Sequence, residues 1–168
     1  MQKVIFLDID GVLNSTICNK NNQCEISDRS LIDPDKVKLL SEIVSKTEAS
    51  IVLHSGWRFW FNKDIQPLRK ESQQLVELLK KSYIFISDIT PDFSTKEIRK
   101  TKKFSRVKAK EILAWLHEHP DVEEWIVIDD LCLHNDEIKI HQVKINQITG
   151  LTQEDVDLAI DMLHETRD

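Results

Sequence analysis

Glycine is scarce in this chain of 168 residues, which contains only Gly11, Gly56 and Gly150. These spacings can build neither the dinucleotide-binding pattern GxGxxG nor the phosphate loop GxxxxGK[ST]. Dehydrogenases and P-loop kinases of the usual kinds are therefore excluded. Gly11 and Gly56 stand beside clusters of polar residues, which indicates that the backbone there needs a special conformation or a close approach.

Cysteines and long apolar runs are also few. The three cysteines form no CxxC pair, and an odd number without a secretory signal favours a reducing compartment, with neither a disulfide framework nor a structural zinc site. The longest apolar runs have four or five residues, whereas a membrane-spanning helix needs about 20. We therefore expect a cytoplasmic protein that crosses no membrane and folds as a single domain over residues 1–168.

The apolar residues that are present, 40% of the chain, alternate between strand-like and helix-like patterns. Five short runs rich in Val, Ile and Phe predict strands at 3–7, 50–54, 83–87, 125–128 and 141–145. Between them lie helical spacings: Asp33-Pro34 marks the start of one helix, and 152–155 resembles a capping box before the last. This alternation predicts an α/β fold, a three-layer Rossmann-like parallel sheet of about five strands with helices on both faces.

Acidic and polar residues follow the predicted strands at the end where parallel sheets collect their functional groups. They are Asp8 and Asp10 after the first strand, Ser55 after the second, and Asp129 and Asp130 after the fourth. Four carboxylates at one edge of a sheet repel one another unless a cation lies between them. Because all these ligands are oxygens, we expect Mg²⁺ rather than Zn²⁺.

In this order, the motifs resemble those of the haloacid dehalogenase-like phosphatases. The resemblance rests on the segment VIFLDIDGVLN, a serine at a strand end, a lysine at a helix start and the segment IVIDD. A narrower similarity is to the small RNA-repair-associated ("Swiss army knife") branch of bacterial and phage domains. It rests on the Ser-Trp-Arg-like second motif and on the segments KEILAWL and GLTQEDVDLAI. The resemblance covers nearly the whole chain.

The resemblance implies a phosphoric monoester hydrolase that works through an aspartyl-phosphate. Asp8 would attack phosphorus, and Asp10 would act first as general acid and then as general base. Mg²⁺ would be held by Asp8, by the backbone carbonyl of Asp10 and by Asp129 or Asp130. An acid two residues after the nucleophile separates the phosphatases of this superfamily from members that lack it.

The phosphate-binding groups that the resemblance implies leave alternatives open. Ser55 and Lys108 would hold phosphoryl oxygens, together with backbone amides around Gly11. Ser55 also fits a simple helix cap, and His54 stands where the narrower branch usually has a small hydroxyl residue, so which hydroxyl binds phosphate stays open. Lys110 competes with Lys108, because both lie at the border of the apolar stripe of their helix.

Four further residues near these motifs are candidates for contacts with the substrate, namely Arg58, Trp57, Asn14 and Lys110. The aromatic run at 57–61 contributes partly to the core, while Trp57 or Trp60 is a candidate for stacking on a base. Arg58 is a candidate for reaching a second phosphate.

Two features bear on the size of the substrate. The stretches at 15–32 and 90–106, where this superfamily inserts its caps, are too short for a large cap domain, so we expect an open site. Residues 96–110 hold eight basic residues against one acid, Glu97. Such a segment either follows a phosphate backbone or forms a solvated loop.

We therefore expect a phosphatase for nucleic-acid ends, such as an RNA or DNA 3′-phosphate, or for nucleotides. The net charge of −6 excludes a general nucleic-acid binder. The alternatives are a phosphatase of small metabolites, either sugars or nucleotides, and a binding module that keeps the fold without turnover.

Overall fold

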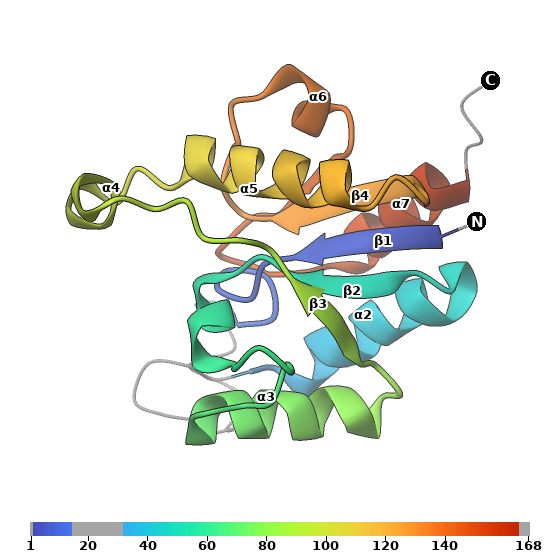
Figure 1. Ribbon diagram of the computed structural model, residues 1–168. Coiled ribbons are helices and arrows are strands. Elements are labelled where there is room, and N and C mark those ends of the chain that lie inside the picture. The colour runs from blue at the N-terminus through green and yellow to red at the C-terminus, as the bar shows by residue number, and fades with distance from the viewer. Residues whose placement is uncertain (1, 15–31, 165–168) are drawn as a thin grey trace.

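The molecule is built around one parallel β-sheet (Figure 1). The computed structural model of the protein describes residues 2–14 and 32–164. In this part of the chain, five strands run parallel in the order β3-β2-β1-β4-β5. The strands are β1 (Gln2–Leu7), β2 (Ser50–Leu53), β3 (Ile86–Ile89), β4 (Val122–Asp129) and β5 (Gln142–Lys144). The three-layer, Rossmann-like α/β fold predicted from the sequence is confirmed.

Helices cover both faces of the sheet (Figure 1). They are α2 (Pro34–Thr47), the 3-10 helix η1 (Gly56–Trp60), α3 (Lys70–Lys81), α4 (Lys96–Thr101), α5 (Ser105–Glu118), α6 (Asp136–Lys139) and α7 (Gln153–His164). Ile5 and Leu7 of β1 belong to the apolar cluster formed with α2, α3 and α7, whereas Val4 and Phe6 belong to the cluster formed with α5 and α6. Burial on both faces explains why β1 reads as a continuous apolar run. Among the described helices, none has the length and apolarity that crossing a bilayer requires.

Two helices begin with the capping chemistry that the sequence predicts. A carboxylate oxygen of Asp33 accepts a hydrogen bond from the Asp35 amide at 2.9 Å, and Pro34 opens α2. Before α7, the Thr152 amide donates to Asp155 Oδ2 at 2.9 Å, and the Asp155 amide donates to the Thr152 hydroxyl at 3.4 Å. These caps fix where the helices leave the loops that surround the sheet.

The edge strand and the segment after it differ from the sequence prediction. A strand is predicted at 83–87, but β3 begins at Ile86, because Tyr83 has a left-handed backbone with φ 58° and its side chain is 86% exposed. The apolar run therefore covers the turn after α3 as well as the strand. The stretch 90–106, expected to be too short for a large cap domain, contains the short helix α4, whose start is capped by Thr95. Of the stretch 15–32, only the buried Ile32 lies within the described residues.

Candidate active site

Residues predicted from four separate motifs come to the carboxyl edge of the sheet. β1 lies between β2 and β4, and the ladder continues past its end, since the Asp8 amide donates to the Ile128 carbonyl at 3.0 Å. Asp8 therefore leaves the sheet beside Asp129, the last residue of β4, while Ser55 follows β2. Lys108 comes from the first turn of α5. The topology alone thus brings these groups to one place.

Three carboxylates gather at this edge. Asp8, Asp129 and Asp130 each place an oxygen within 4.8 Å of the others. Asp8 and Asp129 are buried, and Asp130 is partly buried. Gly11 makes room for them, because its φ is +77° and a Cβ at this position would lie 2.6 Å from Oδ2 of Asp130. Both the turn after β1 and the close approach of Asp130 therefore require glycine.

The ammonium of Lys108 lies between two of these carboxylates. Its Nζ donates to Oδ2 of Asp8 at 2.9 Å and to Oδ2 of Asp129 at 2.8 Å. Burial alone would lower the pKa of Lys108, but the charges of Asp8 and Asp129 outweigh it and raise the pKa to about 12. Lys110 is exposed. Of the two candidate lysines, the structure brings Lys108 to the carboxylates.

The two adjacent acids at the end of β4 have opposite pKa shifts. Burial would raise the pKa of Asp129, but hydrogen bonding and charge from His54, together with the ammonium of Lys108, hold it below its ordinary value. Burial raises the pKa of Asp130 to about 6, and the negative charges of Asp8 and Asp129 add to the effect. A carboxyl group in this situation is one whose ionised form a divalent cation would stabilise.

Asp10 has a different environment from Asp8. Its carboxylate is exposed and accepts a hydrogen bond from Asn14 Nδ2 at 2.9 Å and from Trp57 Nε1, which is 3.2 Å from each oxygen. Oδ1 of Asn14 accepts in turn from the Gly11 amide at 2.8 Å. Asn14 and Trp57 thus hold the predicted general acid in place. Their contacts with substrate, and that of Gly11 with phosphate, stay predictions.

Two buried residues of the second motif, His54 and Ser55, follow β2. The Ser55 hydroxyl accepts a hydrogen bond from the Trp57 amide at 3.3 Å, so it caps η1. Nε2 of His54 lies 3.0 Å from Oδ2 of Asp129, which places this ring against the acid cluster. In the sequence, His54 is marked only as a departure from the usual hydroxyl residue, and its spacing from Asp129 carries no signal of their contact.

Arg58 is buried and bonded within the protein. Its Nη2 donates to Oε2 of Glu111 at 2.9 Å, and its Nη1 donates to the carbonyls of His54 at 3.2 Å and Ser55 at 3.1 Å. Burial raises the pKa of Glu111, although the charge of Arg58 acts against it. Glu111 is a residue of this site that sequence reasoning missed, and the pair ties the loop after β2 to α5. A contact between Arg58 and a second phosphate stays a prediction.

A cavity of about 250 Å³ opens onto these residues. Asp8, Asp10 and Lys108 supply polar groups to its lining. Four apolar side chains also line the cavity, namely Phe59, Phe104, Val107 and Leu131. The cavity therefore presents an acidic and a basic group together with an aromatic, apolar wall.

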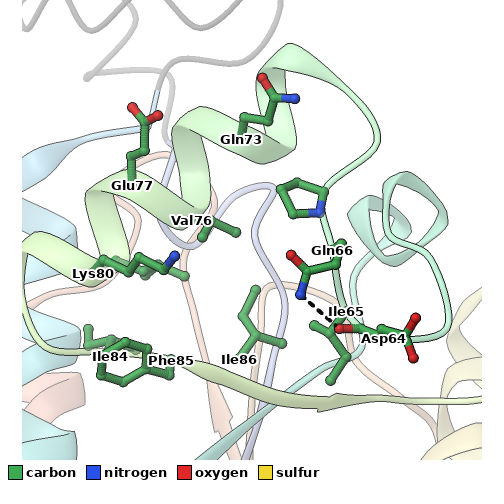
Figure 2. Close-up of a pocket in the computed structure, with 12 residues that line it drawn as sticks. Asp64, Ile65, Gln66, Gln73, Val76, Glu77, Lys80, Ile84, Phe85 and Ile86 are labelled. Atoms are coloured by element: carbon green, nitrogen blue, oxygen red, sulfur yellow. Dashed lines mark hydrogen bonds between the residues drawn. The ribbon is translucent and has the colours of Figure 1, made fainter.

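A separate hollow of about 380 Å³ lies between α3, the loop before it and the segment that leads into β3 (Figure 2). Val76 and Lys80 of α3 border it on one side and Phe85 and Ile86 on another (Figure 2). Its lining has no residue in common with the cavity at the acid cluster. The two hollows are therefore distinct, and the predicted catalytic residues line only the first.

The sheet, with Asp8 and Asp10 after β1, Ser55 after β2, Lys108 on α5 and the acid pair after β4, defines a haloacid dehalogenase-like (HAD) domain. Within that class, the chain belongs to the family described as the HAD domain in Swiss Army Knife RNA repair proteins, whose model matches residues 4–156. Comparisons with curated proteins and with solved structures find no match. HAD domains are generally hydrolases of the phosphatase type.

The acid cluster fits the Mg²⁺ that HAD enzymes generally use. Asp8, Asp129 and Asp130 offer only oxygen atoms, which are the donors that Mg²⁺ prefers. The raised pKa of Asp130 reflects burial beside two other acids, and a bound cation would offset that repulsion. The residues present therefore suit a hard divalent cation.

Proposed function

We propose that the protein is a Mg²⁺-dependent phosphatase that removes a phosphate from the end of a nucleic acid through an aspartyl-phosphate. The observation that carries the proposal is the position of Lys108, at 2.9 Å from Asp8 and 2.8 Å from Asp129, with Asp130 beside them. A nucleophile, a cation for phosphoryl oxygens and a set of metal ligands thus converge from three elements. Positioned charges of this kind supply most of the catalysis of phosphoryl transfer.

Asp8 is the nucleophile in this proposal. One of its carboxylate oxygens attacks phosphorus, so that a bond between Asp8 and phosphorus forms while the bond to the leaving oxygen breaks. Lys108 is already bonded to Oδ2 of Asp8, so a phosphoryl group on Asp8 would come within its reach. The Ser55 hydroxyl accepts from the Trp57 amide and keeps its own proton to donate to a phosphoryl oxygen. When bound, Mg²⁺ would offset the negative charge shared by the carboxylates and the phosphate.

Asp10 transfers the protons. It protonates the leaving oxygen in the first step, and in the second it takes a proton from the water that attacks the aspartyl-phosphate. The hydrogen bonds from Asn14 and Trp57 fix its carboxylate for both steps. The exposure of Asp10 suits this work, because the leaving group and the water both come from outside.

Two observations support a nucleic-acid end as the substrate. The description of the family names RNA repair. In addition, α4 projects beyond the carboxyl ends of the strands (Figure 1), and Lys100, Lys102 and Lys103, on α4 and in the turn after it, are exposed. Exposed lysines at this edge suit the phosphates of a polynucleotide.

A phosphate-release assay with Mg²⁺ tests the proposal. The substrates are oligonucleotides with a 3′- or a 5′-phosphate, mononucleotides and sugar phosphates. Each is assayed also with Asp8→Asn, which keeps the shape of the side chain and replaces the nucleophilic carboxylate with a neutral amide. We expect the highest kcat/KM on an oligonucleotide end and no turnover by the variant. Release by a folded Asp8→Asn protein would reject the covalent mechanism. A preference for a sugar phosphate would identify a small-metabolite phosphatase, and no turnover of any substrate would identify a binding module.

A further inference from the structure

Beside its polar residues, the catalytic cavity has an aromatic and apolar wall, which offers a sugar no hydrogen bonds. Phe59, Phe104 and Val107 line the same cavity as Asp8 and Lys108. Phe59 is 50% exposed, so a large part of its ring is open to a ligand. A phosphoester bound at Asp8 therefore places its leaving group next to an aromatic surface.

The geometry of η1 explains why Phe59 is the aromatic residue that faces outward. A 3-10 helix has three residues per turn, so residues three apart lie on one side. Trp57 is 2% exposed and packs against Trp60 with ring centroids 4.7 Å apart, so this pair lies on the inner side. Stacking on a substrate by Trp57, one of the sequence-based expectations, would require this buried ring to leave the core. Phe59 needs no such movement.

The guanidinium groups of Arg58 and Arg99 both lie close to the Phe59 ring. The central carbon of Arg58 lies 4.6 Å from the ring centroid, and that of Arg99 lies 5.6 Å from it. Arg99 belongs to α4, and Asp92 at 2.6 Å and Ser94 at 3.0 Å hold its guanidinium. Its side chain is nevertheless 57% exposed. Phe59, which lines the cavity, and Arg99, whose guanidinium lies beside the Phe59 ring, together form a partly fixed and partly cationic surface.

We propose that Phe59 and Arg99 form a stacking surface for the nucleobase of the nucleotide that carries the phosphate. This inference rests on the proposed function and adds to it a reason for selecting nucleotides over sugar phosphates. Aromatic rings and guanidinium planes both stack on bases, whatever the base, because each base has a π-face. A sugar phosphate has no such face and leaves the wall of Phe59 and Phe104 without a partner.

The dimensions and charges around Phe59 suggest how the rest of the strand lies. The cavity of about 250 Å³ is smaller than the roughly 300–1,000 Å³ of pockets that enclose a whole ligand, so it admits part of one nucleotide. Arg58 and Phe59 also border a neighbouring hollow, of about 540 Å³, which is lined by the acids Asp88, Asp92 and Glu118. Asp92 is paired with Arg99, but the carboxylates of Asp88 and Glu118 would repel a phosphate backbone. The strand therefore leaves toward α4 and its lysines.

The test compares two phosphorylated oligonucleotides that differ only in the base of the phosphate-bearing nucleotide, one complete and one abasic. For the wild-type protein we expect kcat/KM to be about tenfold or more higher on the complete end, as base stacking predicts. Phe59→Ala should bring this ratio close to one, and Phe59→Trp should retain it. Phe85→Ala, which removes another exposed phenylalanine, from the separate hollow in Figure 2, is the matched control and should leave the ratio as in wild type.

The outcomes separate this inference from the proposed function. If complete and abasic ends are turned over equally, or if folded Phe59→Ala keeps the wild-type ratio, the stacking surface is refuted while the phosphatase stands. If no phosphorylated end is turned over at all, both are refuted. Should Phe59→Ala fold poorly, Arg99→Gln changes an exposed side chain of the same surface and should lower the ratio by a smaller factor.

Discussion

Removing the indole N–H of Trp57 should weaken catalysis without removing any group that reacts. In Trp57→Phe, Asp10 loses the donor that lies 3.2 Å from each of its oxygens but keeps Asn14 Nδ2 at 2.9 Å. A hydrogen bond to a charged group contributes about 1.5–3 kcal/mol. Asp10 is exposed and water can replace part of this bond, so we take the lower end of that range, which corresponds to a loss of about tenfold in rate.

The assay measures kcat/KM on a substrate with a poor leaving group, such as an alkyl phosphate, and on nitrophenyl phosphate. The poor leaving group needs the proton from Asp10, so the tenfold loss should appear there and shrink on nitrophenyl phosphate. Asp10→Asn should lose more on the alkyl ester, on the order of 10²–10⁴-fold, because the acid itself is gone. Trp57→Phe should therefore fall between wild type and Asp10→Asn.

Trp60→Phe is the matched control. Trp60 packs against Trp57 at a centroid separation of 4.7 Å, and its substitution removes the same atoms three residues further along η1. Circular dichroism and thermal unfolding show whether both variants are folded, since Trp57 is a core residue and its truncation also costs stability. Equal losses in the two folded variants, or a loss in Trp57→Phe that ignores the leaving group, would reject Trp57 as a positioning residue for Asp10.

Three further predictions concern the acid cluster and the basic segment. Gly11→Ala should cost about 1–2 kcal/mol of stability, because it puts a side chain on a left-handed backbone. It should also raise the Mg²⁺ concentration needed for half-maximal activity, because its Cβ would displace Asp130. A wild-type Mg²⁺ titration in the folded variant would contradict this. Activity should disappear with a chelator and return with Mg²⁺. Asp129→Ala and Asp130→Ala should each raise the Mg²⁺ concentration needed for half-maximal activity, at least one of them severely. Full activity in chelator would exclude this metal site. The basic segment is tested by neutralising three exposed lysines together, Lys100, Lys102 and Lys103. This should lower the ratio of oligonucleotide to nitrophenyl phosphate turnover at fixed Mg²⁺ and flatten the salt dependence of that ratio. An unchanged ratio would show that the basic segment does not bind substrate.

The sequence predicts the fold well because the strands at its centre are buried on both faces. β1 and β4 carry continuous apolar runs that have few alternative structures. At the edge of the sheet, the apolar run at 83–87 predicts a strand that begins too early. The run includes the exposed Tyr83, which belongs to the turn before β3. Local composition cannot tell a turn that carries aromatic residues from the strand that follows it.

The site was predictable in its motifs and unpredictable in its contacts. Order along the chain brings Asp8 and the acid pair after β4 to one edge, but periodicity leaves Lys108 and Lys110 equal. Only the long-range pairing of Lys108 with Asp8 and Asp129 distinguishes the two lysines. Likewise, the aromatic run at 57–61 does not reveal which ring is buried, because that depends on a 3-10 turn of five residues that the sequence does not mark.

The Arg58–Glu111 pair has a consequence for how the site responds to its surroundings. Glu111 lies one turn after Lys108 on α5, and Arg58 lies in η1, just after Ser55, so this buried pair clamps together the two elements that carry the proposed phosphate ligands. Ions in solution screen exposed charges far more than buried ones. The spacing between Ser55 and Lys108 is thus insulated from ionic strength, while capture of a charged strand by the lysines near α4 is not. Added salt should therefore slow the binding of a charged strand while leaving the rate of the chemical step on a bound phosphate unchanged.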